Sequence, residues 1–264
     1  MVRELRLKTS DGEELGGWFI DGRSDRPIVL LLHGNGASRS RSLPEAEFVA
    51  ELGSAVMLIS HRAHGDSSGE YNDIGYSARK DVLAAVDWLR EHKPGRPIVV
   101  WGRSLGSAAA LFAAPELRET VVGFILECPY ADLRQAVRNR TEFFLPLGLE
   151  QIAYAGLLTV SPLVLPHLND ISPRQAAAQM PKSAQVLILA GEMDRRSPPS
   201  EAEEICRALP GGGQCVVIPQ ADHNRLIQTD RERCRQLFRQ FLDRCTTGEP
   251  VPAILPSPQT EPQE

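Results

Sequence analysis

One serine lies between two glycines in the run Gly102-Arg103-Ser104-Leu105-Gly106, which follows the apolar segment PIVVW and precedes LGSAAALFAA. A Gly-x-Ser-x-Gly pattern alone arises by chance in many proteins, but between a strand and a helix it is typical of a strained turn that exposes a nucleophilic serine. The glycines let the strand and the helix pass closely. The pattern therefore predicts that Ser104 attacks a carbonyl carbon; a glycine-rich turn with a bystander serine is the alternative.

A serine hydroxyl needs a base within hydrogen-bond reach before it can attack an ester carbonyl. His223 lies in the segment QADHN, directly after the last apolar run that could form a strand. A loop there is well placed to present an imidazole to Ser104. We therefore predict that His223 is the general base, against the alternative of a solvated loop histidine.

The third residue of such a site is a carboxylate that orients the imidazole and stabilises the imidazolium. Asp194 follows the apolar run VLILAG and precedes Ser197-Pro198-Pro199, which gives the chain order serine, aspartate, histidine. We predict that Asp194 is this acid. Three other carboxylates near strand ends remain alternatives: Glu192, Glu127 and Asp132.

Acyl transfer also requires donors aimed at the developing oxyanion, and the loss of one costs roughly 3 kcal/mol of transition-state stabilisation. The N–H group of Leu105, next to the serine, is one predicted donor. The second is the N–H group of Asn35 in the glycine-rich loop HGNG, which follows the apolar run IVLLL. That loop could instead be a simple turn or a phosphate cradle, but no GK[ST] motif accompanies it.

Two further groups of polar residues invite other interpretations. His61, His64 and Asp66 are zinc-ligand types, but no additional ligand cluster completes a metal site, so we expect hydrogen-bonding roles instead. Arg103, inside the Ser104 turn, could meet an anionic substrate, although a structural role is the favoured prediction.

These residues need a sheet to hold them. Two alternating segments joined at Asp11-Gly12 predict an antiparallel hairpin. Six continuous apolar runs follow, and runs that are apolar on both faces are typical of strands covered by helices on both sides. The eight predicted strands are Val2–Lys8, Glu14–Ile20, Ile28–Leu32, Ala55–Ile59, Pro97–Trp101, Val121–Leu126, Val186–Ala190 and Gln214–Ile218.

Segments with helical periodicity separate the runs, most clearly Tyr76–His92 and Asp230–Cys245. We find no fixed repeat. The alternation predicts an α/β architecture: a mostly parallel sheet with an antiparallel N-terminal hairpin and helices on both faces. Residues 1–245 are expected to form this one domain, and the Pro-, Thr- and Glu-rich tail 246–264 is expected to be disordered.

Residues 129–180 separate two predicted strands by far more than a usual connection, which predicts a helical lid over the site. Its apolar side chains must bury against something, and they could line an acyl pocket or only complete the core. They are Phe143, Phe144, Leu145, Leu147, Leu149, Leu157, Leu158, Leu163, Val164 and Leu165.

The composition limits the partners and the location. Of the 264 residues 42% are hydrophobic and 24% charged, and a net charge of -5 without a basic run argues against nucleic acid. The N-terminus lacks the apolar core of a signal peptide, so we predict a cytoplasmic protein without a transmembrane segment. The five cysteines are scattered without a CxxC pair and are expected to be reduced.

Taken together, these motifs resemble the α/β-hydrolase superfamily, in its serine aminopeptidase-like, dienelactone hydrolase-like and acyl-protein thioesterase-like branch. The resemblance runs from about Val2 to Cys245. The segment RAHGDSSG resembles the family's RGxGxSxG loop, but Ala63 stands where glycine is usual and His61 where an aromatic or acidic residue is common.

The resemblance implies hydrolysis of an ester, thioester or amide through an acyl-enzyme, without a metal or organic cofactor. A carboxylic ester or thioester of an acyl substrate is the first expectation and an amide or peptide is the second. A ligand-binding module that has the same fold and no catalysis is the alternative from another class.

Overall fold

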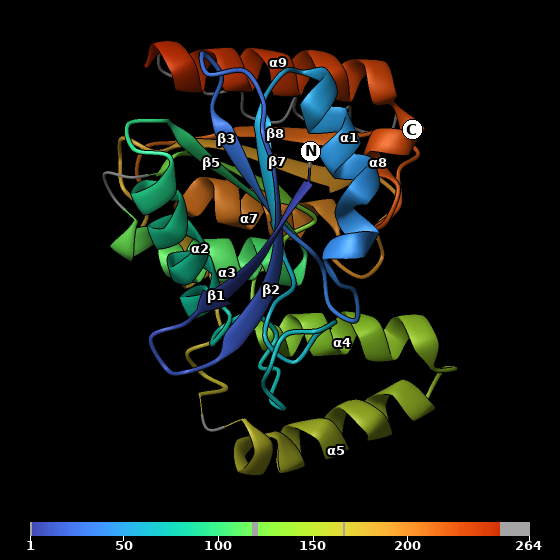
Figure 1. Cartoon of the computed structure of the whole chain (residues 1–264). Helices are drawn as coiled ribbons and strands as arrows, with labels where there is room; N and C mark the ends of the chain where they lie inside the picture. Colours follow the sequence, from blue (N-terminus) through green and yellow to red (C-terminus); the bar gives the residue numbers. More distant parts are fainter. Residues whose placement is uncertain (1, 118–120, 166, 249–264) are drawn as a thin grey trace, which may run out of the picture.

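The computed structural model describes residues 2–117, 121–165 and 167–248, and its strands form one eight-stranded sheet in the order β1-β2-β4-β3-β5-β6-β7-β8 (Figure 1). β1 pairs with β2, and β2 with β4, in antiparallel fashion; all other pairs are parallel. The strands are β1 (Val2–Lys8), β2 (Glu14–Ile20), β3 (Ile28–Leu32), β4 (Ala55–Ile59), β5 (Ile98–Arg103), β6 (Val121–Glu127), β7 (Gln185–Gly191) and β8 (Gln214–Ile218).

The central strands are apolar throughout because each of their two faces contacts a separate layer of helices. In β3, Ile28 and Leu30 belong to one apolar cluster, whereas Val29 and Leu31 belong to the cluster on the opposite face. All four side chains are almost completely buried. This alternation is the reason that a continuous apolar run, and not a half-polar one, forms each parallel strand.

Helices cover both faces (Figure 1). The cluster on one face includes residues of α2, α3, α6 and α7, and the cluster on the other includes residues of α1, α8 and α9. The helices are α1 (Leu43–Glu51), α2 (Arg79–His92), α3 (Leu105–Ala113), α4 (Leu133–Phe144), α5 (Leu149–Val164), α6 (Pro173–Ala177), α7 (Pro199–Ala208), α8 (Leu226–Thr229) and α9 (Arg231–Thr247), with short 3-10 turns at η1 (Arg39–Ser42) and η2 (Ala114–Glu116).

The predicted architecture is confirmed, and every predicted strand lies within two residues of its observed bounds. One boundary is wrong. Thr246 and Thr247, assigned to a disordered tail, continue α9, which ends at Gly248 because this glycine adopts φ 77° and its N–H donates to the carbonyl of Arg244. The remainder of the predicted tail, 249–264, lies outside the described residues.

The expectation of five reduced cysteines is also wrong. Cys206 of α7 and Cys215 of β8 form a disulfide, whereas Cys128, Cys234 and Cys245 are free and buried. The connection from α7 to β8 brings residues nine positions apart to a Cα–Cα separation of 6.5 Å, a tertiary approach that a search for CxxC spacing does not detect.

The predicted lid segment divides into two parts. Its last helix, α6, belongs to the core, since Ala176 and Ala177 are buried among residues of α3 and α7. Helices α4 and α5 pack on each other at the edge of the molecule, with α5 outermost (Figure 1). Among the described residues, no helix is long and apolar enough to cross a membrane.

We expected the apolar side chains of this segment to be buried, but most of them are exposed. Exposed positions include Phe143, Phe144, Leu145, Leu147, Leu149, Leu157 and Leu163, with Leu147 at 96% exposure. Leu158 and Leu165 are partly buried, and Leu165 packs against a small cluster that contains Leu168. Most of these residues therefore complete no core, because α5 lies on α4 and not on the sheet.

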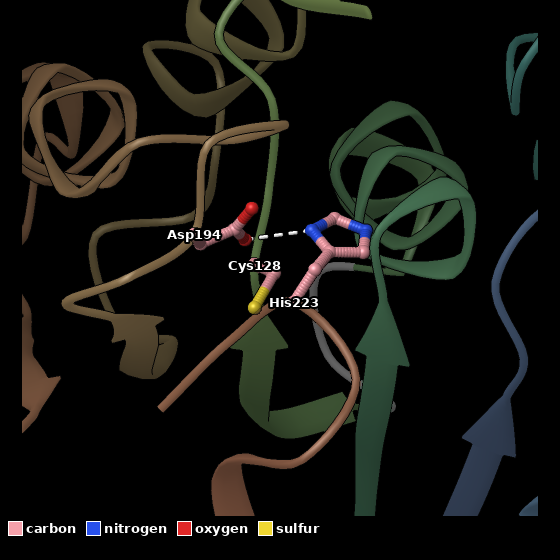
Figure 2. Close-up of side chains that lie close together, drawn as sticks. All are labelled: Cys128, Asp194 and His223. Atoms are coloured by element: carbon pink, nitrogen blue, oxygen red, sulfur yellow. Dashed lines mark hydrogen bonds and ion pairs between the residues drawn. The ribbon is translucent and has the colours of Figure 1, made fainter. Parts of the chain in front are cut away.

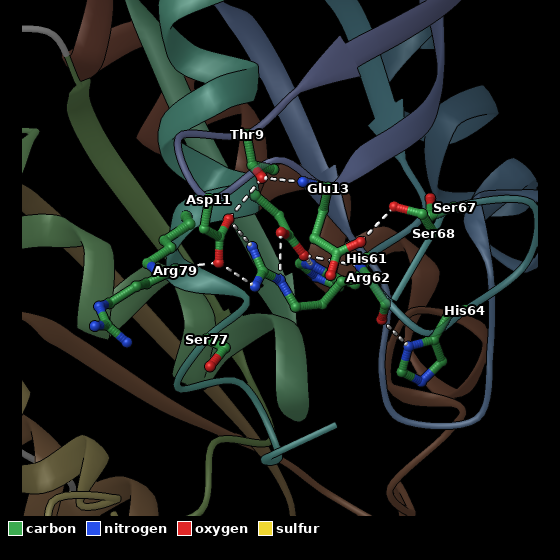
Figure 3. A network of polar contacts seen from close by, with 12 residues as sticks. Thr9, Asp11, Glu13, His61, Arg62, His64, Ser67, Ser68, Ser77 and Arg79 are labelled. Atoms are coloured by element: carbon green, nitrogen blue, oxygen red, sulfur yellow. Dashed lines mark hydrogen bonds and ion pairs between the residues drawn. The ribbon is translucent and has the colours of Figure 1, made fainter. Parts of the chain in front are cut away.

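A buried arginine ties the segment after β4 to its neighbours (Figure 3). The Nε atom of Arg62 donates to Asp81 of α2 at 2.8 Å, and its two terminal nitrogens donate to Asp11 in the β1–β2 turn at 2.8 and 3.0 Å. Asp81 also accepts the backbone N–H of Arg62 at 2.9 Å. One guanidinium thus links the hairpin, α2 and the RAHGDSSG loop.

Removal of this guanidinium should destabilise the fold strongly. Arg62→Met leaves the fully buried Asp81 without its cation, and breaking such a pair costs roughly 3–5 kcal/mol. Lys80→Met is the matched control, since Lys80 is an exposed partner of Asp11 and should contribute about 1 kcal/mol or less. Denaturant unfolding of both variants measures the difference; equal free energies of unfolding would contradict the prediction.

Candidate active site

The turn at Ser104 joins β5 to α3 in a conformation that few residues adopt. Ser104 has φ 52° and ψ −108°, and its N–H donates to the carbonyl oxygen of Glu127 at 2.8 Å. A side chain at Gly102 would overlap the backbone of Gly106, and one at Gly106 would overlap the backbone of Leu32. The two glycines are therefore required by the close passage of strand and helix, which holds the serine in its strained turn.

Asp194 and His223 lie on adjacent loops, after β7 and β8, and contact each other directly (Figure 2). The Nδ1 atom of His223 and the Oδ2 atom of Asp194 are 2.6 Å apart. The other carboxylate oxygen, Oδ1, accepts the N–H groups of Arg196 and Ser197 at 2.9 and 3.0 Å. Three hydrogen bonds thus stabilise this buried carboxylate.

The electrostatics keep Asp194 ionised. Burial by itself raises the pKa of the carboxyl, but the hydrogen bond from His223 and those from Ser197 and Arg196 outweigh it, so the pKa lies below its ordinary value. A carboxylate in this state holds Nδ1 of His223 protonated and leaves Nε2 as the ring nitrogen that can accept a proton.

The structure brings Asp194, and none of the three alternative carboxylates, to His223. Glu192 is exposed and accepts the N–H of Gln220 at 2.9 Å. Glu127 is buried beside Trp101, whose ring N–H donates to it, and burial raises its pKa to about 7. Asp132 caps the N-terminus of α4.

A buried cysteine that the sequence analysis missed lies beside this pair. Potential ligand atoms of Cys128, Asp194 and His223 fall within 4.8 Å of one another (Figure 2). Nδ1 of His223 and Oδ2 of Asp194 already contact each other directly, and burial raises the pKa of the Cys128 thiol well above its usual range, which disfavours the thiolate that a metal would bind. The donor set therefore favours an acid–base pair over a metal centre.

Histidines position the loop that follows β3. His33 accepts the N–H of His61 through Nε2 at 3.0 Å, and its Nδ1 lies 2.8 Å from the carbonyl oxygen of Gly34. The Nε2 atom of His64 accepts the N–H of Gly36 at 3.2 Å. Burial, followed by the proximity of His61, lowers the pKa of His33 to about 2, so it stays neutral in this role.

The suspected zinc-ligand types are thus distributed among different contacts. His61 and His64 take part in the loop hydrogen bonds just described, and Asp66 forms ion pairs with Arg6 and Arg39. The expected hydrogen-bonding roles are observed for the side chains of His64 and Asp66, but not for that of His61, whose buried ring nitrogens form no hydrogen bond with the described residues.

One pocket of about 760 Å³ contains most of the predicted site residues. Ser104, His223 and Asn35 all line it, whereas Leu105, whose N–H is the other predicted oxyanion donor, follows Ser104 as the first residue of α3. The volume of this pocket lies in the range of sites that bind small molecules. The lining residues are Gly34, Asn35, Gly36, Ala37, Ser38, Ser40, Arg41, Gly65, Arg103, Ser104, Arg140, Phe144, Arg196, His223 and Asn224.

The pocket also contains residues that sequence reasoning did not identify, above all Arg140 of α4 and Arg196 of the Asp194 loop. In the sequence, the pair Arg195-Arg196, directly after the predicted acid, was the one signal that arginine side chains line the pocket. Arg103, which was considered for an anionic substrate, instead forms an ion pair with the buried Glu45 at 3.2 Å. The favoured structural role of Arg103 is supported.

Comparison with known sequences gives a family match and several relatives, some of which match most of this chain. The model of the hydrolase family described as "Serine aminopeptidase, S33" matches residues 23–155. An uncharacterized protein of Mycobacterium tuberculosis is 28% identical over 91% of this chain and 79% of its own length. The lysophosphatidylserine lipase ABHD12 of Gallus gallus is 32% identical, over only 46% of this chain and 33% of its own length.

Solved structures agree with the family match. The esterase Pf2001 of Pyrococcus furiosus is 25% identical and superposes with a TM-score of 0.79, covering 92% of this chain and 91% of its own. The esterase EaEST of Exiguobacterium antarcticum, 17% identical with a TM-score of 0.68 over 91% of this chain and 100% of its own, shares the fold. With its eight-stranded sheet and the match over half of its length, this chain belongs to the serine aminopeptidase, S33, hydrolase family of the α/β-hydrolase superfamily.

Proposed function

We propose that the chain hydrolyses carboxylic esters or thioesters through an acyl-enzyme formed on Ser104. The observation that carries the proposal is the 2.6 Å contact between Asp194 and His223, in a pocket that His223 and Ser104 line together. A strained serine, a histidine and a buried carboxylate are the three groups that acyl transfer to a hydroxyl requires.

In the proposed reaction, Oγ of Ser104 attacks the carbonyl carbon of the substrate while Nε2 of His223 takes the proton of the Ser104 hydroxyl. Asp194 stabilises the imidazolium, and the N–H groups of Asn35 and Leu105 bind the oxyanion. His223 then protonates the leaving alcohol or thiol, and the C–O or C–S bond breaks. Water, deprotonated by the same histidine, hydrolyses the acyl-enzyme and restores Ser104.

Ester cleavage ranks before amide cleavage. The similar Pyrococcus protein is an esterase and the similar Gallus protein is a lysophosphatidylserine lipase, and both are ester hydrolases. The description of the matching family, serine aminopeptidase, favours amide or peptide hydrolysis as the second candidate on the same three residues. Amine leaving groups need stronger assistance from the general acid, so ester substrates should react faster.

We further propose that α4 and α5 act as a lid that selects substrates. Phe144, at the end of α4, is 66% exposed and lines the pocket that contains Ser104. Phe143 and Phe144 also line a neighbouring hollow with His223. Leu158 of α5 lines neither of these spaces, so the end of α4 is the part of the segment that can contact a bound acyl chain.

Loss of the serine hydroxyl tests the proposed nucleophile. Ser104→Ala should lower kcat for 4-nitrophenyl esters by about four to six orders of magnitude and abolish labelling by a fluorophosphonate probe. Ser200→Ala is the control, because Ser200 is an exposed serine at the start of α7. This substitution should change neither kcat nor labelling. Unchanged turnover in Ser104→Ala would refute the proposed function. Absence of labelling and turnover in the native protein would instead support a non-catalytic module.

Neutralisation of the carboxylate tests the proposed acid. Asp194→Asn should preserve the fold but lower kcat by about 10⁴-fold, because the imidazole loses its orienting charge and favoured tautomer. Asp132→Asn is the matched change at the N-cap of α4 and should leave both kcat, within about twofold, and stability nearly unchanged, because asparagine caps a helix about as well as aspartate. If Asp132→Asn or Glu127→Gln lowers kcat more than Asp194→Asn, Asp194 is not the acid.

The lid proposal predicts a change in chain-length preference. Phe144→Ala should reduce the kcat/KM ratio of longer to shorter acyl esters, since each buried CH₂ contributes about 0.8 kcal/mol, or roughly fourfold. Leu158→Ala, outside the pocket, should keep the ratio of the native protein. A ratio that is unchanged in Phe144→Ala, or changed equally in both variants, would contradict the assignment of Phe144 to substrate selection.

A further inference from the structure

The pocket with Ser104 and His223 has an uneven charge. Four arginines line it, Arg41, Arg103, Arg140 and Arg196, and none of the described lining residues is an aspartate or glutamate. The whole chain carries a formal net charge of -5, so this concentration of guanidinium groups is local.

Only one of the four arginines has its charge compensated in the described part of the chain. Arg103 pairs with Glu45 at 3.2 Å, whereas Arg140 and Arg196 form no ion pair with the residues that the structure describes. Burial, and then repulsion by Arg196, lowers the pKa of Arg140. Arg140 and Arg196 are thus half-buried and close enough to repel each other, and neither forms an ion pair with a carboxylate of the described residues.

The two carboxylates whose charges act on Arg140, Asp194 and Glu201, accept hydrogen bonds from other groups. Asp194 accepts hydrogen bonds from His223, Arg196 N–H and Ser197 N–H. Glu201 accepts the N–H of Ala131 at 2.6 Å and the side-chain amide of Asn139. Burial raises the pKa of Glu201 to about 7, so it supplies less than a full negative charge near neutral pH.

Both arginines are also held in place. The backbone of Arg196 is fixed at its N–H by Asp194 and at its carbonyl oxygen by the Asn139 amide, which lies 3.3 Å away. One terminal nitrogen of Arg140 donates to the carbonyl of Ala136 at 2.9 Å, which leaves its other donors available. Arginine presents five donors in a planar fork that matches a carboxylate or a phosphate.

We propose that the ester which this site cleaves carries an anionic group, a carboxylate or a phosphate, and that Arg140 and Arg196 bind that group. The inference rests on the proposed ester hydrolysis at Ser104 and adds the substrate class. An anion between the two guanidiniums removes their mutual repulsion and completes the hydrogen bonds that the protein leaves unmade. Because Arg196 adjoins Asp194 and shares both hollows with His223, the bound anion lies beside the reacting ester.

Pairs of esters that differ by one charge test the proposal. For an anion on the acyl part, the pair is 4-nitrophenyl hydrogen succinate and methyl 4-nitrophenyl succinate. For an anion on the alcohol part, it is acetylglycerol 3-phosphate and acetylglycerol. We expect kcat/KM to favour the anionic member of at least one pair by about tenfold, the effect of one charge-assisted contact. No preference in either pair, with the esters hydrolysed, overturns the inference.

Arginine variants test which residues produce the preference. Arg140→Gln and Arg196→Gln should each lower the anionic-to-neutral kcat/KM ratio by about tenfold. Arg138→Gln and Arg207→Gln are the matched controls, because these substitutions remove the same charge. Both arginines are exposed and pair with Glu142 and Glu203 outside the pocket. A ratio that falls equally in the controls shows only a net-charge effect and overturns the assignment.

Inorganic phosphate separates failure of this inference from failure of the proposed function. At constant ionic strength, phosphate should bind the protein, as measured by calorimetry, and the Kd should rise about tenfold in Arg140→Gln and Arg196→Gln. Binding does not require catalysis, so it is measured equally well in Ser104→Ala. Phosphate that binds neither form, or binds the arginine variants as tightly, contradicts the anion site even when esters are hydrolysed.

Discussion

The close passage of β5 and α3 at Gly102 and Gly106 is the constraint on which the rest of the site depends. The backbone of Ser104 is held at φ 52°, a conformation that residues other than glycine rarely adopt and that costs on the order of 1–3 kcal/mol. The surrounding sheet, buried on both faces, supplies the rigidity that maintains this strain. A substitution with a larger residue at either glycine would push the backbone of α3 or β3 away and release the serine from the pocket.

The features that the sequence predicted correctly are those that depend on local pattern. Apolar runs such as Ile28–Leu32 contain their own evidence, because burial on both faces requires apolar residues at every position. The turn at Ser104, Asp194 and His223 each follow a strand of this kind. Since parallel strands end at the same edge of the sheet, residues that follow such strands are expected to meet at that edge.

The features that the sequence did not predict depend on which surfaces meet. Arg140 lies on a helix of ordinary amphipathic composition, and only the packing of α4 beside the Asp194 loop brings it into the pocket. The disulfide between Cys206 and Cys215 arises in the same way, from a helix returning to the neighbouring strand. The apolar residues of α5 were expected to be buried and are mostly exposed. Hydrophobicity indicates burial only when a partner surface exists.

In the proposed mechanism, Asp194 connects catalysis and recognition through a single carboxylate. Its Oδ2 holds the imidazole of His223, and its Oδ1 holds the backbone of Arg196, so a displacement of the loop would move both together. In that mechanism the carboxylate of Asp194 stabilises the imidazolium, while Arg196 contributes a positive charge to the lining of the pocket. In a protein of negative net charge, a local concentration of positive charge in a cleft focuses the field there. Anions that the rest of the surface repels are then attracted only to the mouth of the site, and orientation of the substrate begins before contact.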